Sequence, residues 1–348
     1  MKMTFRWYGD DDPVTLQKIR QIPCMSGIVS AVYDVKPGGV WSMESILAIK
    51  QKAQANGLVF EVVESVPVAE DIKLGNEKAS LLIENYCENI RRLAKAGVKC
   101  ICYNFMPVFD WLRSELEHQQ PDGANALAFD NETVLKMNPL TSELSLPGWD
   151  ESYSKDALKE LLHQYEAVDE EQLWRNLEVF LKAVIPVAKE CGVNMAIHPD
   201  DPPWGIFGLP RIITNEKNLE RFLSIVDEPN NGLTFCTGSL GANPDNDLVK
   251  MAGRFAPRIH FAHLRNILHT GDKQFEEVAH PSACGSLDMY GIVKAFCDNG
   301  FDGYVRPDHG RMIWGETGRY GYGLYDRALG ATYLTGLFEA IERNGREK

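Results

Sequence analysis

Two histidines, a cysteine and an aspartate in this chain have the residue types of a divalent-metal site. His198, Cys236, His263 and Asp308 each stand at the C-terminal edge of a short apolar segment. Imidazole, thiolate and carboxylate groups are ordinary ligands of transition-metal ions. Four such groups at the ends of four successive segments predict one metal centre, and therefore a metal-dependent enzyme.

The four segments have the composition of β-strands. VNMAIH, GLTFC, RIHFAH and FDGYVRPD are short and rich in β-branched and aromatic residues. Helix-like segments separate them, an alternation typical of a parallel sheet. In a parallel barrel, the side chains just beyond the C-terminal strand ends gather on one rim. This arrangement would bring the four ligand candidates together.

The whole chain repeats this alternation. Eight segments have strand-like composition: 4–8, 27–33, 58–65, 98–105, 193–198, 232–236, 258–263 and 301–306. Gly57, Gly97, Gly192 and Gly300 each follow a helix-like segment and lead directly into a strand, which is a helix-stop pattern. The sequence therefore predicts an α/β fold, a single (β/α)8 TIM barrel over 1–348, rather than two domains.

One connection is much longer than the others. Residues 106–169 separate the fourth strand from its helix, and only 170–191 resembles an ordinary connecting helix. Long segments without regular structure are uncommon in compact domains and usually form lids or interfaces. We therefore predict an insertion at 106–169 that is either a lid over the barrel mouth or an oligomer contact.

Composition narrows the range of partners. With 36 Lys and Arg against 49 Asp and Glu, the formal net charge is −13. This balance argues against a nucleic-acid partner and against an anionic membrane surface. An acidic substrate would need local cations, and the C-terminal part of the chain offers Arg265, Arg306, Arg311 and Arg319.

The sequence also suggests a compartment. The apolar stretches are shorter than the ~18–20 residues that span a bilayer, and MKMTFRWYGDDDP lacks the apolar region of a signal peptide. The eight cysteines are scattered and include no CxxC pair, so a disulfide scaffold is not indicated. We expect a cytoplasmic protein without a membrane partner.

Each ligand candidate has a structural alternative. Cys236 could be a small core residue, and Asp308 could cap a turn. His260 and His263 are three apart on one strand and point to opposite faces, and the strand-end position favours His263. His309 diverges from Asp308, so it could address a bound substrate. Because four protein ligands would already complete tetrahedral zinc, a catalytic ion here is more consistent with five- or six-coordinate Mn²⁺ or Fe²⁺.

A glycine-rich aromatic segment follows the last predicted strand. Residues 310–324 contain Arg311, Trp314 and Arg319, and Tyr325 follows at once. Such a loop is suited to folding over a polar, anionic substrate. The alternative is a flexible loop whose aromatic side chains pack on the barrel mouth. A tyrosine could transfer a proton there only if a nearby cation lowers its pKa from about 10.

With these motifs, the chain resembles the mannonate dehydratase family of the xylose-isomerase-like barrel superfamily. The resemblance runs the whole length, through FRWYG, GIVSAVYD, IHPDDPP, FCTGSLGAN, HFAHLRN and RPDHGRMIWGE. It implies Mn²⁺- or Fe²⁺-dependent dehydration of D-mannonate to 2-dehydro-3-deoxy-D-gluconate in hexuronate catabolism. The family's metal ligands match His198, Cys236, His263 and Asp308.

The resemblance also implies roles around the metal. Its acid and base residues match His309 and Tyr325, without deciding which of the two is the acid. We expect substrate contacts from the nearby cations and the indole: Arg265, Arg311, Trp314 and Arg319. We also expect a homo-oligomer, most simply a dimer.

Two other functions fit parts of the pattern. A metal-dependent sugar isomerase could use the same barrel, but such enzymes usually present several carboxylates and often two metals, whereas this rim offers one clear carboxylate ligand. A sugar-acid-binding barrel with a structural zinc would not be an enzyme. A metal assay combined with a mannonate turnover assay separates the three.

Overall fold

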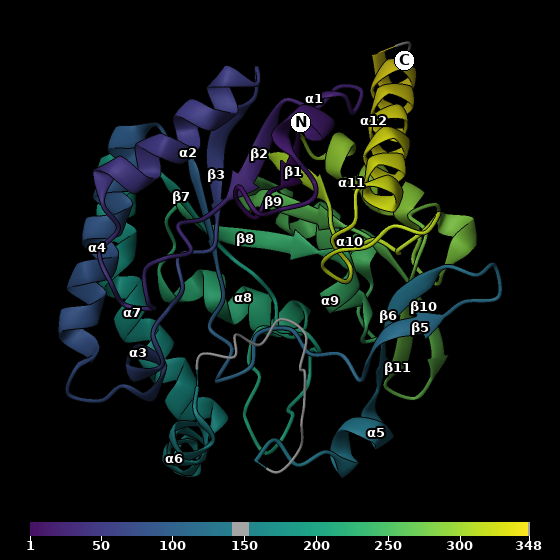
Figure 1. Ribbon diagram of the computed structural model, residues 1–348. Coiled ribbons are helices and arrows are strands. Elements are labelled where there is room, and N and C mark those ends of the chain that lie inside the picture. The colour runs from purple at the N-terminus through teal and green to yellow at the C-terminus, as the bar shows by residue number, and fades with distance from the viewer. Residues whose placement is uncertain (141–152, 347–348) are drawn as a thin grey trace.

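The computed structural model describes residues 1–140 and 153–346. Eight parallel strands close into a barrel in the order β1-β12-β9-β8-β7-β4-β3-β2 (Figure 1). They are β1 (Lys2–Arg6), β2 (Gly27–Ser30), β3 (Val59–Glu64), β4 (Cys100–Tyr103), β7 (Asn194–Ile197), β8 (Asn231–Cys236), β9 (Ile259–Leu264) and β12 (Tyr304–Pro307). Each overlaps one of the eight predicted segments, so the predicted TIM barrel is confirmed.

The barrel strands bury both faces, as parallel strands do. On β4, Cys100 and Cys102 belong to a small cluster inside the barrel, together with Phe261 of β9. Ile101 and Tyr103 alternate with them and belong to the large core between the barrel and the helices. The period of two explains why these strands have near-continuous apolar sequences.

Helices surround the barrel (Figure 1). The main ones are α1 (Leu16–Arg20), α2 (Met43–Ala55), α4 (Ala79–Ala96), α7 (Glu170–Cys191), α8 (Glu216–Ile225), α10 (Leu248–Phe255), α11 (Met289–Asp298) and α12 (Tyr325–Arg346). Gly97 after α4 and Gly192 after α7 both adopt positive φ, 93° and 64°. Glycine reaches this region without a Cβ penalty, so it ends each helix and turns the chain into the next strand.

A second sheet, which the sequence analysis did not predict, stands beside the barrel mouth (Figure 1). Its antiparallel strands lie in the order β10-β11-β6-β5. They are β5 (Glu115–Gln119), β6 (Asn125–Asp130), β10 (Asn266–Gly271) and β11 (Gln274–Val278). One hairpin comes from the predicted insertion and the other follows β9, so segments far apart in sequence form one sheet.

The rest of the predicted insertion is partly helical. It contains α5 (Asn131–Lys136) and α6 (Lys155–Tyr165), while residues 141–152 lie outside the described part of the chain. The remaining short helices are α3 (Glu70–Leu74), α9 (Thr237–Gly241), η1 (Ala256–Arg258) and η2 (Ser282–Cys284). Whether the 106–169 insertion acts as a lid or as an oligomer contact stays a prediction.

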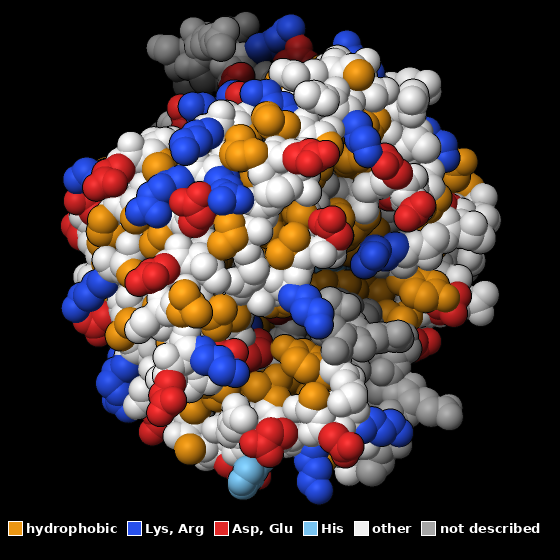
Figure 2. Space-filling view, turned by 60° about the vertical axis from the view of Figure 1, so that its left-hand side comes forward, with side chains coloured by type: hydrophobic (Ala, Val, Ile, Leu, Met, Phe, Trp, Pro, Cys, Tyr) orange, Lys and Arg blue, Asp and Glu red, His pale blue; other side chains and the backbone are white. Residues whose placement is uncertain are grey.

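The charged residues are spread over the surface. On the face in Figure 2, acidic and basic side chains are interspersed. Ion pairs within helices contribute to this pattern, for example Arg92 with Glu88 on α4 and Lys182 with Glu178 on α7. Within 1–140 and 153–346, no helix is both long enough and apolar enough to cross a membrane.

Candidate active site

The C-terminal ends of four neighbouring strands bring the predicted metal ligands together. His198 follows β7, Cys236 ends β8, His263 lies on β9 and Asp308 follows β12. His198 Nε2 is 3.2 Å from His263 Nδ1, and the Cys236 thiol donates to Asp308 Oδ2 at 3.3 Å. His263 Nδ1 is 3.9 Å from Asp308 Oδ1. All four side chains therefore converge on one rim.

This group has the properties of a metal site. One ligand atom each of His198, Cys236 and His263 lies within 4.8 Å of the others. Asp308 Oδ1 is buried without a hydrogen bond. Buried polar atoms are normally satisfied, so an unpaired carboxylate oxygen beside two imidazoles and a thiol fits a cation. The donor set of nitrogen, sulfur and oxygen suits a transition-metal ion.

A second group of metal-ligand type shares His263. Glu64 and Cys102 also lie within ligand distance of that ring. However, burial raises the pKa of the Cys102 thiol well above its usual range, and Thr234 donates a hydrogen bond to its sulfur. A thiol that stays protonated is a poor metal ligand. The first group is therefore the better metal site.

Two guanidinium groups hold Asp308 in place. Arg306 Nη1 is 2.8 Å from Asp308 Oδ1, and Arg265 forms an ion pair with the other oxygen. Arg306 also pairs through two nitrogens with Glu64, at 3.0 and 3.1 Å, and Arg265 pairs with Asp201 at 2.7 Å. Burial alone would raise the pKa of Asp308, but Arg265 and Arg306 hold it well below its usual range. Asp308 is therefore an anionic carboxylate at neutral pH.

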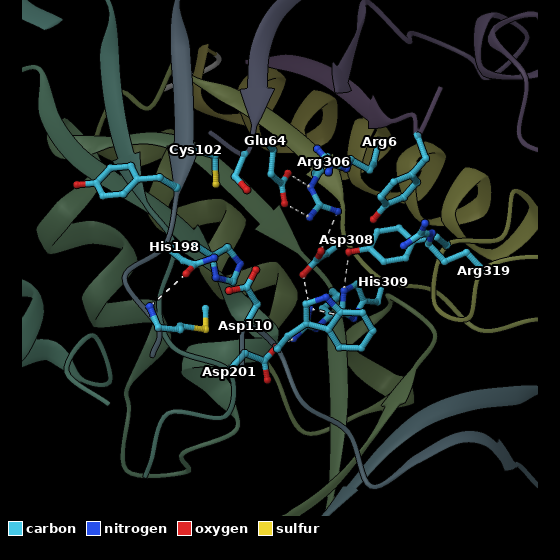
Figure 3. Close-up of a pocket in the computed structure, with 18 residues that line it drawn as sticks. Arg6, Glu64, Cys102, Asp110, His198, Asp201, Arg306, Asp308, His309 and Arg319 are labelled. Carbon is cyan, nitrogen blue, oxygen red and sulfur yellow. Dashed lines mark hydrogen bonds and ion pairs between the residues drawn. The ribbon is translucent and has the colours of Figure 1, made fainter. Parts of the chain in front are cut away.

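His309 lies beside this group and has a partner at each ring nitrogen. Its Nδ1 is 2.8 Å from Glu277 Oε1, and its Nε2 is 2.9 Å from the Tyr322 hydroxyl. The ring of Trp111 packs against it at a centroid distance of 4.8 Å. His309, Trp111 and Tyr322 all line the same pocket as His198 and Asp308 (Figure 3). An imidazole and a phenol are thus placed next to the candidate metal site.

The structure does not bring Tyr325 to this pocket. Tyr325 is 42% exposed at the start of α12, and its ring packs against Trp314, which is 74% exposed. Glu316 accepts hydrogen bonds from the backbone N–H groups of Leu324 and Tyr325, and so fixes the beginning of the helix. Tyr322, three residues earlier, is the tyrosine that turns inward to His309.

The predicted substrate-binding residues also divide into two groups. Arg265 and Arg319 line the pocket. Arg311 is not among the lining residues and instead pairs with Asp326 and Asp122, at 2.9 Å each. Trp314 does not line the pocket either. The substrate contacts predicted for Arg311 and Trp314 therefore find no support in the pocket geometry.

Two pocket cations have no carboxylate partner. Arg6 and Arg319 pack against the ring of Tyr8, with guanidinium-to-centroid distances of 4.7 and 4.2 Å. Arg6 is only 7% exposed, and its Nη1 has no hydrogen bond. Within the described residues, neither side chain forms an ion pair. Both lie on the side of the pocket away from His198 (Figure 3).

Several residues of the site were missed in the sequence, although some had a usable signal. Arg6 and Glu64 end the first and third barrel strands, so the rule that found the metal ligands could also have found them. Asp201 lies in the proline-rich turn after β7. Glu277 had no such signal, because it lies on a hairpin outside the barrel.

The fold and rim define a class of protein, the xylose-isomerase-like TIM barrels. A protein of that description from Mycobacterium smegmatis, solved in complex with magnesium, superposes with a TM-score of 0.56 at 14% identity over 94% of this chain and 88% of that one. At that identity the likeness concerns the fold alone. The family model described as D-mannonate dehydratase (UxuA) matches residues 1–348, and the chain belongs to that family.

Individual relatives agree with this assignment. The chain is 57% identical over 343 residues to mannonate dehydratase 2 of Halalkalibacterium halodurans, covering 98% of this chain and 99% of that protein. The crystal structure of mannonate dehydratase from Streptococcus suis serotype 2 superposes with a TM-score of 0.93 at 49% identity, over 99% of this chain and 96% of that one. The predicted family is confirmed, and the chain is a carbon–oxygen lyase that dehydrates D-mannonate.

Proposed function

We propose that the reaction takes place where the metal-ligand group meets His309 and Tyr322, and yields 2-dehydro-3-deoxy-D-gluconate in hexuronate catabolism. The supporting observation is that His198, Asp308, His309 and Tyr322 line one pocket. In this proposal the metal is Mn²⁺ or Fe²⁺, and its ligands are the four side chains predicted above: His198, Cys236, His263 and Asp308.

The donor chemistry supports this choice of ion. Thiolate and imidazole favour a transition metal, and the anionic Asp308 is compatible with Mn²⁺ as well as Fe²⁺. Both ions accept five or six ligands, so four protein ligands leave positions for substrate oxygens. When bound, such an ion would polarise the substrate carboxylate and a neighbouring hydroxyl, and stabilise negative charge that develops on them.

The protein's own residues move the protons. Dehydration removes the proton on C2 and the hydroxyl on C3; the hydroxyl leaves as water once it is protonated, and the resulting enol tautomerises to the 2-keto acid. Burial raises the pKa of Tyr322 well above its usual range, so its hydroxyl stays protonated and can donate. We assign Tyr322 as the acid that protonates the leaving hydroxyl, and His309 as the base that takes the C2 proton.

Tyr322 takes here the role that the sequence analysis gave to Tyr325. The supporting evidence is the 2.9 Å contact between the Tyr322 hydroxyl and His309 Nε2, together with the exposure of Tyr325. The catalytic role of Tyr325 stays a competing prediction. Substitution of each tyrosine separates the two assignments.

The unpaired cations bind the substrate in this proposal. Arg6 and Arg319 can donate hydrogen bonds to substrate oxygens without giving up a carboxylate partner. Arg265 also lines the pocket, but Asp201 and Asp308 already take its hydrogen bonds. Its main effect is therefore to hold Asp308 anionic. Arg311 and Trp314 would have to act from outside the pocket.

We further propose that the enzyme works in the cytoplasm as a homo-oligomer, most simply a dimer. All eight cysteines lie in the described part of the chain and are free thiols, which is compatible with a reducing compartment. Light scattering on the purified protein tests the dimer. A species of one-chain mass at micromolar concentration would contradict it.

Incubation of the Mn²⁺-loaded protein with D-mannonate tests the function directly. The expected product is a 2-keto acid that lacks one water. An isomerase acting at the same site would give a product of unchanged mass, and a binding protein would give none. Removal of the ion by a chelator should abolish turnover, and Mn²⁺ or Fe²⁺ should restore it.

A further inference from the structure

We propose that Glu277 is a positioning residue for His309, and that the four-stranded sheet outside the barrel supports it in that place. The inference deepens the proposed function and rests on it, because it concerns the orientation of the proposed base. Glu277 lies on β11, outside the barrel and far from the segments on which the rim residues were predicted.

The contact between the two side chains is direct and buried. Glu277 is 1% exposed, His309 is 3% exposed, and Oε1 of the glutamate is 2.8 Å from Nδ1 of the imidazole. The same oxygen accepts hydrogen bonds from Arg113, at 2.7 Å from Nη2 and 3.1 Å from Nε. Arg113 is in turn paired through two nitrogens with Asp201, at 2.8 and 3.0 Å. The carboxylate therefore has little freedom to move.

This contact determines which nitrogen of His309 carries the proton. An ionised carboxylate can only accept hydrogen bonds, so a carboxylate at 2.8 Å requires a proton on Nδ1. In the neutral ring the lone pair is then on Nε2, the atom next to Tyr322 and the pocket. The base thus presents its free lone pair to the substrate side. A carboxylate that fixes the tautomer of a catalytic histidine can account for a large part of its activity.

One neighbour favours the opposite tautomer. Arg265 Nη1 lies 3.3 Å from His309 Nδ1 and could donate only to an unprotonated nitrogen. That guanidinium nitrogen already forms a closer ion pair with Asp308. The shorter contact, from His309 to the Glu277 carboxylate, therefore decides the tautomer.

The second sheet holds Glu277 through both its backbone and its side chain. β11 pairs with β6 of the insertion, where Phe275 and Phe129 stack with ring centroids 5.5 Å apart. Gln120, at the end of the β5–β6 hairpin, donates to the backbone oxygen of Glu277 at 3.0 Å. Arg113 comes from the insertion just before β5. The first part of the insertion thus has a structural role at the active site, whatever its outer part does.

The adjacent residue offers a matched control. Side chains alternate along a strand, and Glu276 points away from His309 to pair with His118 of β5 at 2.8 Å. Glu276→Gln makes the same chemical change one residue away, on the other face of the same strand. It lies outside the catalytic and binding machinery.

The test compares Glu277→Gln with Glu276→Gln in the full-length, Mn²⁺-loaded enzyme. A glutamine at 277 fits the space but is uncharged, and its amide can also donate, so the tautomer is no longer fixed. We expect kcat to fall about 10- to 100-fold or more, with KM within about threefold and unchanged metal content. Glu276→Gln should stay within about twofold of the unsubstituted enzyme.

A spectroscopic measurement separates positioning from general support. In ¹⁵N-histidine-labelled metal-free protein, the His309 signals are identified by their loss in His309→Asn. The proton is expected on Nδ1 in the unsubstituted chain and in Glu277→Asp, which keeps the charge, and it should shift toward Nε2 in Glu277→Gln. If Glu277→Gln does not fold, Glu277→Asp still tests the tautomer in the presence of the carboxylate.

The outcomes also distinguish this inference from the proposed function. If His309→Asn retains full turnover, His309 is not the base and the proposed function itself is wrong. If His309→Asn is inactive while Glu277→Gln has a normal kcat, or while Nε2 carries the proton in the unsubstituted protein, only the positioning role is wrong.

Discussion

The hydroxyl of Tyr322 lies 2.9 Å from Nε2 of His309, and both side chains are buried at the pocket. The rings meet edge to face with centroids 4.9 Å apart. Tyr322 also packs against Tyr8, which follows β1, so the glycine-rich segment after β12 is attached to the opposite end of the chain. A proton donor and a proton acceptor are therefore held in contact before substrate arrives.

The first prediction compares two tyrosines. Tyr322→Phe removes the only proton that the side chain can transfer and keeps the ring, so kcat should fall by about 10²–10⁴ while metal content is unchanged. Tyr325→Phe should stay within about threefold, because that hydroxyl lies outside the pocket. Steady-state kinetics with D-mannonate checks both. The reverse order of effects would restore Tyr325 as the catalytic tyrosine.

The difference between the two tyrosines illustrates what sequence patterns can predict here. The barrel and the convergence of His198, Cys236, His263 and Asp308 follow from strand periodicity, because a parallel barrel places all C-terminal strand ends on one rim. The segment at 310–324 has no such periodicity. Which of its aromatic side chains turns inward depends on loop packing, which sequence spacing does not determine.

The second sheet was not predictable for a related reason. β5 and β10 belong to hairpins separated by more than a hundred residues, and their polar sequences reflect a sheet with one face in solvent. Glu277 and Arg113 become functional only through this long-range pairing. By contrast, Arg6 and Glu64 could have been found, since each ends a correctly predicted strand.

The second prediction concerns the metal ligands. Cys236→Ser keeps a small polar side chain next to Ser239 and Asp308, but a hydroxyl is a much poorer anionic ligand than a thiolate. Mn²⁺ affinity, measured by titration of the metal-free protein, should fall roughly 10-fold or more with the fold unchanged. Cys102→Ser is the matched control, because that residue belongs to the alternative group with Glu64.

In this comparison Cys102→Ser should bind Mn²⁺ as tightly as the unsubstituted protein. If it loses the ion while Cys236→Ser keeps it, the metal belongs to Glu64, Cys102 and His263. Equal affinity in both variants would mean that neither sulfur is a ligand, and Cys236 would then be a buried core residue.

The third prediction concerns stability at acid pH. His260 lies on the outer side of β9 over Gly232, and its Nε2 donates to the Pro229 carbonyl at 2.9 Å. Burial lowers the pKa of His260 to about 4, with Arg258 also lowering it, while the Pro229 carbonyl and Asp302 act in the opposite direction. The unfolded chain, with a histidine pKa of about 6.5, therefore binds this proton first as the pH falls.

It follows that the contribution of His260 is fully present above pH 6.5 and is lost as the pH falls toward 4. His260→Gln keeps a donor for the Pro229 carbonyl but cannot take up a proton. The free energy of unfolding should therefore fall less steeply between pH 6.5 and 4 in the variant than in the unsubstituted protein. Denaturant titrations across this window measure the difference, and parallel curves would contradict it.

The last prediction concerns Arg6. Its guanidinium is buried in the pocket wall, stacks on Tyr8 and lacks a carboxylate partner among the described residues. Maintaining an unpaired buried charge is costly unless a ligand compensates it, and the substrate is an anion rich in hydroxyl groups. Arg6→Gln should therefore raise KM for D-mannonate about 10-fold or more with a smaller change in kcat, as expected for loss of a binding contact.

Arg311→Gln is the informative comparison, because the sequence analysis assigned substrate contact to that residue as well. Arg311 is bound by Asp326 and Asp122 outside the pocket, so its substitution should lower thermal stability and leave KM within about twofold. A raised KM in Arg311→Gln with a normal KM in Arg6→Gln would contradict this assignment. The free charge of Arg6 would then serve the fold, and the substrate would approach from the side of the glycine-rich segment.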